Sequence, residues 1–465
     1  MSMQSRYRFA CAWLPDGWHR NVVISVDPAG DIVDVSRDDT VTTARTVNGA
    51  AIPGMPNVHS HAFQRAMAGL TEQRGGNDDS FWTWREAMYD VASRITPECL
   101  NAIAAQLYAD MLKAGYTSVC EFHYLHSHVE ASSEQHAHEV RLAMSQALID
   151  AANTAGIGLT LLPTLYQTAD FGGAPPTERQ RQFSMQTREY LDLLGALRQS
   201  SQRSAQLEIG IALHSLRAVP PESLQMVLQS RQLGQPTHIH IAEQEREVQA
   251  CQQHFGKRPI EWLLENAPVD RHWCLVHATH ATNAELQGIA ASGAVVGLCP
   301  TTEANLGDGI FPMEALLAAG GVFAIGSDSH ISLSPIEELR WLEYQARLAR
   351  RQRSVLTSAG QSGGTLLWQR ACTAGARVTG RPVGELAVGK RADVVVLDLN
   401  SPLFAARNDT SIIDTFVFSG TSESVRDVMV GGRWLVQERR HFAETAVSAG
   451  YKRALQKMLK KERSG

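Results

Sequence analysis

The chain has 465 residues, 44% hydrophobic and 20% charged, a balance typical of a globular protein with a sizeable core. Its formal net charge of −5 offers no basic surface for a nucleic acid, and no run of about 18 apolar residues suggests a membrane span or an export signal. Seven cysteines, an odd number without C-x-x-C spacing, argue against a disulfide framework and favour a reducing compartment, so we expect a cytoplasmic protein.

Two β-strands are predicted in residues 21–35, on either side of a turn that contains Pro28 and Gly30. They precede a short apolar run that begins at Ala51. We therefore expect residues 1–52 to form the first part of a small β domain.

Eight short apolar runs follow between residues 51 and 330, and each precedes a segment that is helical in pattern or long enough to hold a helix. Eight consecutive β-then-α units predict an α/β protein with a (β/α)8 TIM-like barrel, which we place in residues 53–384. The runs end near His61, His123, Tyr166, Arg217, Glu243, His280, Glu303 and His330.

The helix before the second run has the clearest boundaries. Thr96 offers an N-cap, Pro97 suits the first helical position, and apolar residues then recur at helical spacing up to Gly115, which offers a stop. The sequence therefore predicts a helix over 97–114 that leads into the second strand.

The end of the chain returns to β-structure. Residues 392–399 and 425–437 predict further strands, the latter folded into a hairpin at Gly431 and Gly432. We expect residues 385–440 to complete the small domain as a β-sandwich with the N-terminal part. Residues 441–465 predict a C-terminal helix with a solvated, lysine-rich face.

Polar residues fall at the carboxyl ends of the predicted barrel strands, which is the face where barrel enzymes place their sites. His59 and His61 lie two residues apart, so in a strand both imidazoles project to one side. Three histidines and a carboxylate predict one divalent metal ion, and zinc suits this donor set. The candidates are His59, His61 and His240 with Asp328, and Glu243 and His277 lie at the ends of the fifth and sixth strands.

Each of these signals is modest alone. His238 competes with His240 as the ligand of the fifth strand because both project to the same side, and Asp328 could cap a turn. Other histidines are set aside: His126 and His128 as loop residues, His136 and His138 as solvated helix residues, and His280 and His330 as groups that orient ligands. The cysteines are expected to be small core residues.

Several motifs resemble the amidohydrolase superfamily over nearly the whole chain. They are PGMPNVHSH, HIHIAE, the lone His277, GSDSH, and the final stretch GELAVGKRADVVVLDL. The resemblance implies a metal-bearing (β/α)8 barrel with a small β domain built from both chain ends.

Within that superfamily the chain is similar to the formimidoylglutamate deiminase family, through HSHAFQRAMAGLTE, FWTWRE, EFHYLH, LHSLRAV, HIHIAEQ and CPTTEANLGDG. This resemblance implies hydrolysis of N-formimino-L-glutamate to N-formyl-L-glutamate and ammonia in histidine degradation, by a homodimer. It implies zinc ligands at His59, His61, His240 and Asp328, catalytic roles for Glu243, His277 and Asp328, and substrate contacts from Gln64, Arg85, Tyr124, His214 and Arg217.

One zinc ion per chain is expected. Relatives with two metals use a bridging lysine or glutamate on a middle strand, whereas the fourth strand here, within 207–217, has no lysine and only Glu208 near its start. A second metal therefore lacks its bridge.

Arg85 and Arg217 fit a small dicarboxylate substrate because the planar guanidinium pairs with a carboxylate through two hydrogen bonds. For Arg85, packing on a tryptophan as a surface cation is an equally good interpretation. Two other functions stay open: another aminohydrolase, such as a guanine or cytosine deaminase, and a non-catalytic assembly protein of the same fold.

Overall fold

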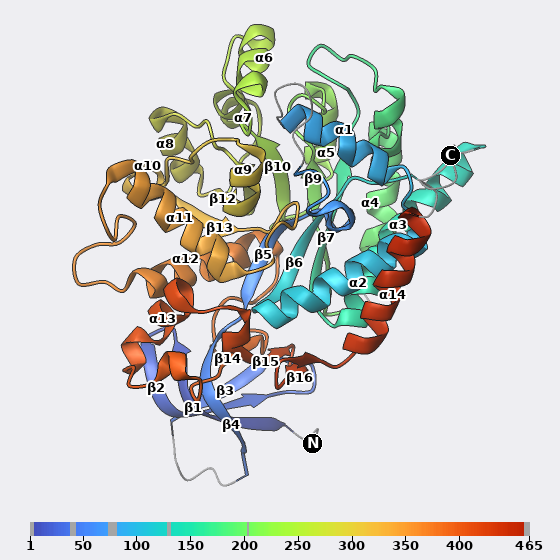
Figure 1. The fold of residues 1–465 in the computed structure, drawn as a ribbon. Helices are drawn as coiled ribbons and strands as arrows, with labels where there is room; N and C mark the ends of the chain where they lie inside the picture. The colour runs from blue at the N-terminus through green and yellow to red at the C-terminus, as the bar shows by residue number, and fades with distance from the viewer. Residues whose placement is uncertain (1–3, 38–42, 73–80, 128–131, 202–203, 460–465) are drawn as a thin grey trace.

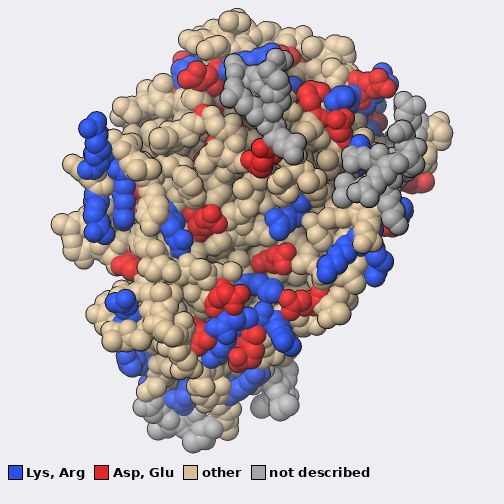
Figure 2. All heavy atoms as spheres, in the orientation of Figure 1, with Lys and Arg blue, Asp and Glu red and all other residues tan. Residues whose placement is uncertain are grey.

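The computed structural model describes residues 4–37, 43–72, 81–127, 132–201 and 204–459. A parallel barrel forms the larger part, and a second sheet lies below it in Figure 1, built from the blue and red ends of the chain. Lys and Arg are interspersed with Asp and Glu over the face drawn in Figure 2. In the described part of the chain, no helix combines the length and the apolar character that crossing a membrane requires.

The barrel strands follow one another in chain order, each parallel to the next, as expected for a (β/α)8 barrel. The fourth strand is split in two, and a parallel bridge between Ser60 and Asp328 joins the last strand to the first. The strands are β5 (Met55–Ser60), β6 (Tyr116–His123), β7 (Gly158–Leu165), β8 (Leu207–Ile209), β9 (Ile211–Leu213), β10 (Thr237–Ile241), β11 (Trp273–His277), β12 (Val295–Leu298) and β13 (Val322–Ile325).

Helices surround the barrel, and a further set covers the mouth at the carboxyl ends of the strands. The 3-10 helices η1 (Ala62–Met67) and η2 (Glu178–Phe183) and the helix α1 (Phe81–Ala92) each line the pocket at this mouth. The others are α2 (Pro97–Ala114), α3 (Glu134–Ala155), α4 (Thr187–Ser201), α5 (Pro221–Gln229), α6 (Glu245–Phe255), α7 (Pro259–Asn266), α8 (Asn283–Ser292), α9 (Pro300–Leu306), α10 (Met313–Ala318), α11 (Pro335–Arg350) and α12 (Gly363–Thr379).

The predicted limits of α2 are confirmed. The Thr96 hydroxyl accepts a hydrogen bond from the Cys99 amide at 3.3 Å, which satisfies one of the free amides of the first turn. Gly115 ends the helix at φ 106°, in the left-handed region that glycine tolerates best. The chain then enters β6 directly, so the cap fixes where the second barrel strand begins.

The second sheet unites the two ends of the chain. Its strand order is β17-β16-β15-β14-β4-β1-β2-β3, and β4 pairs with β14 where the N-terminal and C-terminal halves meet. The bounds are β1 (Ser5–Leu14), β2 (Gly17–Val26), β3 (Ile32–Ser36), β4 (Arg45–Pro53), β14 (Val394–Leu397), β15 (Val425–Val430), β16 (Arg433–Gln437) and β17 (Arg440–His441), with short helices η3 (Pro402–Phe404), η4 (Asp409–Ser411), α13 (Ile412–Ser419) and η5 (Ser422–Ser424) between β14 and β15.

The small domain predicted from both chain ends is confirmed. Ile24 of β2 and Val396 of β14 share one apolar cluster although two strands, β4 and β1, lie between them in the sheet, so the sheet curves around its own core. Gly431 and Gly432 both have positive φ, as the predicted two-residue hairpin requires. The domain boundaries at residues 52, 384 and 440 stay predictions.

The C-terminal helix forms as α14 (Glu444–Leu459), which lies along α2 (Figure 1). Lys113 at the end of α2 donates to Glu444 at 2.6 Å. The helix is therefore attached to the barrel wall. The remainder of the predicted segment, 460–465, lies outside the described residues.

We predict that Gly326→Ala destabilises the fold by about 2 kcal/mol or more, because overpacking typically costs roughly 1–3 kcal/mol. A Cβ at Gly326 would lie 2.7 Å from the His59 Cβ and 2.9 Å from the His59 backbone N and O. Urea unfolding measures the effect. The matched control is Gly195→Ala in α4, where a Cβ meets nothing within 4 Å; equal stabilities of the two variants would contradict the prediction.

Candidate metal centre

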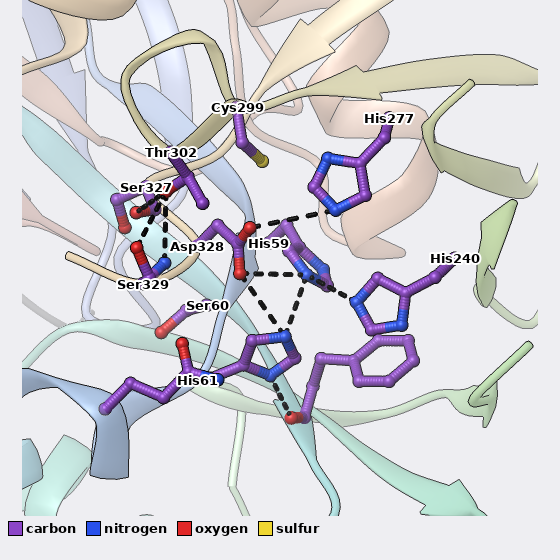
Figure 3. A network of polar contacts seen from close by, with 12 residues as sticks. His59, Ser60, His61, His240, His277, Cys299, Thr302, Ser327, Asp328 and Ser329 are labelled. Atoms are coloured by element: carbon purple, nitrogen blue, oxygen red, sulfur yellow. Dashed lines mark hydrogen bonds and ion pairs between the residues drawn. The ribbon is translucent and has the colours of Figure 1, made fainter. Parts of the chain in front are cut away.

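Three barrel strands, β5, β10 and β13, bring the predicted ligands to one point inside the mouth. His59 lies at the end of β5, His61 follows it, His240 lies in β10, and Asp328 lies in the turn after β13 (Figure 3). All four side chains are buried. The period of two in β5 therefore does what the sequence predicts, because both imidazoles project into the barrel while Ser60 turns away.

The donor atoms converge closely. His59 Nε2 lies 3.1 Å from His61 Nε2 and 3.0 Å from His240 Nε2. Asp328 Oδ1 lies 3.3 Å from His61 Nε2 and 3.6 Å from His59 Nε2. One donor atom from each of His59, His61 and His240 lies within 4.8 Å of the other two. The same holds for a second group, His59, His277 and Asp328.

The tautomers of two histidines can be assigned from their outer hydrogen bonds. His61 Nδ1 donates to the Phe122 carbonyl, and His240 Nδ1 donates to the His214 carbonyl, both at 2.9 Å. Burial lowers the pKa of both His61 and His240, so both rings are neutral and turn an Nε2 lone pair inward.

Those two lone pairs both face His59 Nε2, which carries at most one proton and can satisfy only one of them. A cation placed among the three nitrogens satisfies all of them at once. Neutral imidazoles with a carboxylate are a donor set for a divalent transition metal, so the residues fit such an ion.

The backbone at the strand ends adopts unusual conformations. His277 has φ 68° and Asp328 φ 42°, in the left-handed region that non-glycine residues rarely adopt. The Asp328 amide donates to the His59 carbonyl at 3.0 Å, and the His61 amide donates to the Asp328 carbonyl at 3.2 Å. Such strain persists where surrounding contacts enforce it, typically at functional sites.

His277 lies among three carboxylates. Its Nε2 is 3.7 Å from Asp328 Oδ2 and 3.9 Å from Glu243 Oε1, and its Nδ1 is 3.2 Å from Glu303 Oε1. Burial lowers the pKa of His277, but these carboxylates outweigh it and raise the pKa to about 10. Burial raises the pKa of Glu243 to about 7. His277 and Glu243 therefore give the site an acid and a base. They lie beside the metal-type cluster, the name we use for His59, His61, His240 and Asp328.

A pocket opens from the cluster, and all five predicted substrate contacts line it: Gln64, Arg85, Tyr124, His214 and Arg217. The structure holds several of them in place. Gln64 Nε2 donates to the Tyr124 hydroxyl, and Arg217 Nη1 donates to the Ala169 carbonyl, each at 2.9 Å. The Arg85 guanidinium lies 4.5 Å from the Trp82 ring. For Arg85, tryptophan packing and pocket lining therefore occur together.

Sequence reasoning missed two carboxylates. Glu303 supports His277, and it follows the seventh strand, a position that could have marked it. Glu247 lines the pocket and accepts hydrogen bonds from the amides of Ala242 and Glu243, both at 3.1 Å. Its only signal was its spacing of four residues from Glu243, since these partners are backbone groups.

The other histidines lie elsewhere. His238 Nε2 donates to the Val378 carbonyl at 2.8 Å, so His240 and not His238 joins the cluster.

His126 lies in a loop and donates to the Thr164 carbonyl, and His128 falls outside the described residues. His136 and His138 lie half-buried in α3, His280 is half-buried, and buried His330 contacts Ser327 and Ser60. The seven cysteines are free and buried, as expected.

Comparisons with known proteins agree with this geometry. The amidohydrolase family model matches residues 50–435. A formimidoylglutamate deiminase of Pseudomonas aeruginosa is 49% identical over 96% of this chain and 98% of its own length. An 8-oxoguanine deaminase of the same species is 27% identical over 83% of this chain and 82% of its own.

Solved structures share the fold. An amidohydrolase from Brucella melitensis is 41% identical with a TM-score of 0.92, covering 98% of this chain and 100% of its own. An adenosine deaminase from Xanthomonas campestris with bound zinc has a TM-score of 0.81 at 21% identity over 99% of both chains, which shows a common fold.

We predict that zinc stabilises the metal-stripped protein against heat, and that His240→Ala loses most of this stabilisation. A ligand at 100 times its Kd stabilises the folded state by about 2.7 kcal/mol. Calorimetric scans with and without zinc measure the shift in Tm. His238→Ala is the matched control, from the same strand but outside the cluster, and it should keep the zinc-dependent shift. A full shift in His240→Ala would remove this residue from the ligand set.

Proposed function

The chain belongs to the amidohydrolase family, and from this premise we propose that it hydrolyses N-formimino-L-glutamate to N-formyl-L-glutamate and ammonia. The relative at 49% identity, which matches over nearly the full length of both chains, is the main support. The observation on this molecule that carries the proposal is one pocket lined both by the metal-type cluster and by two arginines, Arg85 and Arg217.

The proposed cofactor is one zinc ion per chain, held by His59, His61, His240 and Asp328. Both candidate groupings among the described residues share His59, which favours a single centre. Glu208, the carboxylate of the split fourth strand, is placed beside Arg381 and not in the pocket lining, so it is not available as a bridge.

A zinc ion held there would acidify a water molecule to a pKa of about 7 and so would supply hydroxide at neutral pH. Asp328 would accept the proton that this water loses, and His277, whose Nε2 lies 3.7 Å from Asp328 Oδ2, would hold the attacking oxygen by a hydrogen bond. As this oxygen adds to the formimino carbon, Glu243, whose pKa burial raises to about 7, would give its proton to the nitrogen. When the C–N bond breaks, Glu243 would pass the hydroxyl proton to the departing nitrogen, so that ammonia leaves and the C=O bond of the formyl product forms. The proton held by Asp328 would then restore Glu243.

The substrate is a dicarboxylate, and Arg85 and Arg217 are proposed to receive its two carboxylates. Guanidinium groups bind carboxylates through paired, charge-assisted hydrogen bonds. Arg217 is fixed at the Ala169 carbonyl and Arg85 at the Trp82 ring, so each donor is partly positioned before substrate arrives. Gln64, Tyr124 and His214 are proposed to complete the contacts.

The cellular setting is also a proposal. Histidine degradation is the reaction sequence in which N-formimino-L-glutamate arises, and the family likeness suggests a homodimer. Seven free, buried cysteines suit a reducing compartment such as the cytoplasm.

Ammonia release from N-formimino-L-glutamate, guanine, cytosine and 8-oxoguanine, with metal content measured on the same sample, tests the proposal. Turnover of the formimino substrate alone, with about one zinc per chain, is the expected result. Preference for a nucleobase would assign the chain to another aminohydrolase class. Absence of both metal and turnover would favour an assembly protein.

Glu243→Gln should lower kcat by about two to four orders of magnitude, because general acid–base groups typically contribute that much. Steady-state kinetics on the formimino substrate measure the loss. Glu245→Gln, an exposed carboxylate two residues away, should keep normal turnover. Near-normal kcat in Glu243→Gln would exclude this residue as the proton carrier.

Arg217→Met should mainly raise KM, by roughly tenfold to a hundredfold, because a hydrogen bond to a charged group contributes about 1.5–3 kcal/mol. Initial rates over a range of substrate concentrations separate KM from kcat. The control is Arg37→Met, an exposed arginine directly after β3. An unchanged KM in Arg217→Met is incompatible with carboxylate binding there.

A further inference from the structure

Glu121 is a fully buried carboxylate behind the metal-type cluster. It lies in β6, opposite Ser60 of β5, and is 2% exposed. It accepts hydrogen bonds from the Ser60 hydroxyl and the Ala62 amide, both at 2.6 Å, and from the Tyr108 hydroxyl at 3.0 Å. All three donors are neutral, and burial raises the pKa of Glu121 to about 7.

Two of the three donors flank the predicted ligand His61 in the chain. The Glu121 side chain therefore holds the backbone on both sides of His61. The carbonyl of the next residue, Phe122, accepts the His61 Nδ1 proton at 2.9 Å. Two consecutive residues of β6 thus fix both the main chain and the ring of this ligand.

The hydrogen bonds continue from Ser60 to the turn that carries Asp328. Ser60 Oγ lies 3.3 Å from His330 Nε2, and His330 Nδ1 lies 3.1 Å from Ser327 Oγ. Asn57 forms the far end of this series of hydrogen bonds. Its Nδ2 donates to Ser327 Oγ at 2.6 Å, and its Oδ1 accepts from the Ser327 amide. We call this set, Glu121, Ser60, His330, Ser327 and Asn57, the anchor chain.

When Glu121 is ionised, the donors of the anchor chain run in one direction. The Ser60 hydroxyl donates to the carboxylate, so it accepts from His330 Nε2, and His330 Nδ1 is then an acceptor for the Ser327 hydroxyl. Ser327 Oγ in turn accepts from the Asn57 amide group, which can only donate through Nδ2. Every hydroxyl donates once and accepts once, and Glu121 is the acceptor that sets the direction.

We infer that Glu121 is a positioning residue, which fixes the segments of His61 and Asp328 through the anchor chain so that the two ligands meet the metal. The inference rests on the metal centre of the proposed function. It concerns residues that project away from the pocket and touch neither the metal nor the substrate.

Glu121→Gln is the sharpest test because it keeps shape and removes only the acceptor. The new amide would donate to the Ser60 hydroxyl, which would then donate to His330 Nε2. Ser327 Oγ would accept from both His330 Nδ1 and Asn57 Nδ2, and its own proton would have no acceptor. The zinc Kd of the metal-stripped protein is measured by competition with a chromogenic chelator, together with the visible spectrum of the cobalt-loaded protein and the Tm without metal.

We expect the zinc Kd of Glu121→Gln to rise roughly tenfold to a hundredfold, as for groups that orient metal ligands, with a changed cobalt spectrum. Glu343→Gln is the matched control. Glu343 is also buried and accepts from the amides of Val355 and Leu356, but it lies in α11 outside the centre. It should lower the Tm and leave the zinc Kd and the spectrum unchanged.

Ser60→Ala provides a second measurement if Glu121→Gln does not fold, because it cuts the anchor chain and leaves all ligands in place. Wild-type zinc affinity and an unaltered cobalt spectrum in Glu121→Gln, or in Ser60→Ala where the first variant does not fold, overturn the inference alone. Failure of the unaltered protein to bind metal would instead overturn the proposed function along with it.

Discussion

The closure of the barrel and the assembly of the metal-type cluster depend on the same hydrogen bonds. The His59 carbonyl accepts from the amides of Ser327 and Asp328 at 3.1 and 3.0 Å, which joins the end of the eighth strand to the first. Gly326 permits this approach because a side chain there would meet the His59 backbone. Asp328 can therefore reach the histidines only in a closed barrel, so folding and site formation are one event.

Burial acts on the site in two opposite ways. The histidines of the cluster are kept neutral, as ligands must be, because an imidazolium is disfavoured there. The carboxylates around His277 reverse the effect and favour its protonated form, while burial favours the protonated form of Glu243. Groups a few ångströms apart thus take different protonation states, which is the condition for acid and base chemistry at one pH.

Much of this could be predicted from the sequence because it follows from local periodicity. The period of two in the strands explains His59 and His61, and strand ends mark His240, His277 and Asp328. Glu121 could not be found this way, since its partner Ser60 lies opposite it on the neighbouring strand. Glu247 could not either, since it accepts from backbone amides, which any residue type supplies. His238 and His240 share a strand pattern, and only the three-dimensional neighbours of each ring distinguish them.

The elements that carry the chemistry differ from those that select the substrate. The ligands lie on β5, β10 and the turn after β13, where the hydrogen bonds of the sheet and of the turn fix them. Arg85 lies on α1 and Arg217 beyond the end of β9, held by a ring contact and one carbonyl. Loops and outer helices tolerate change better than paired strands. Substitution at these two positions can therefore alter the substrate while leaving the hydrolytic centre intact, so a shared barrel does not by itself imply a shared substrate.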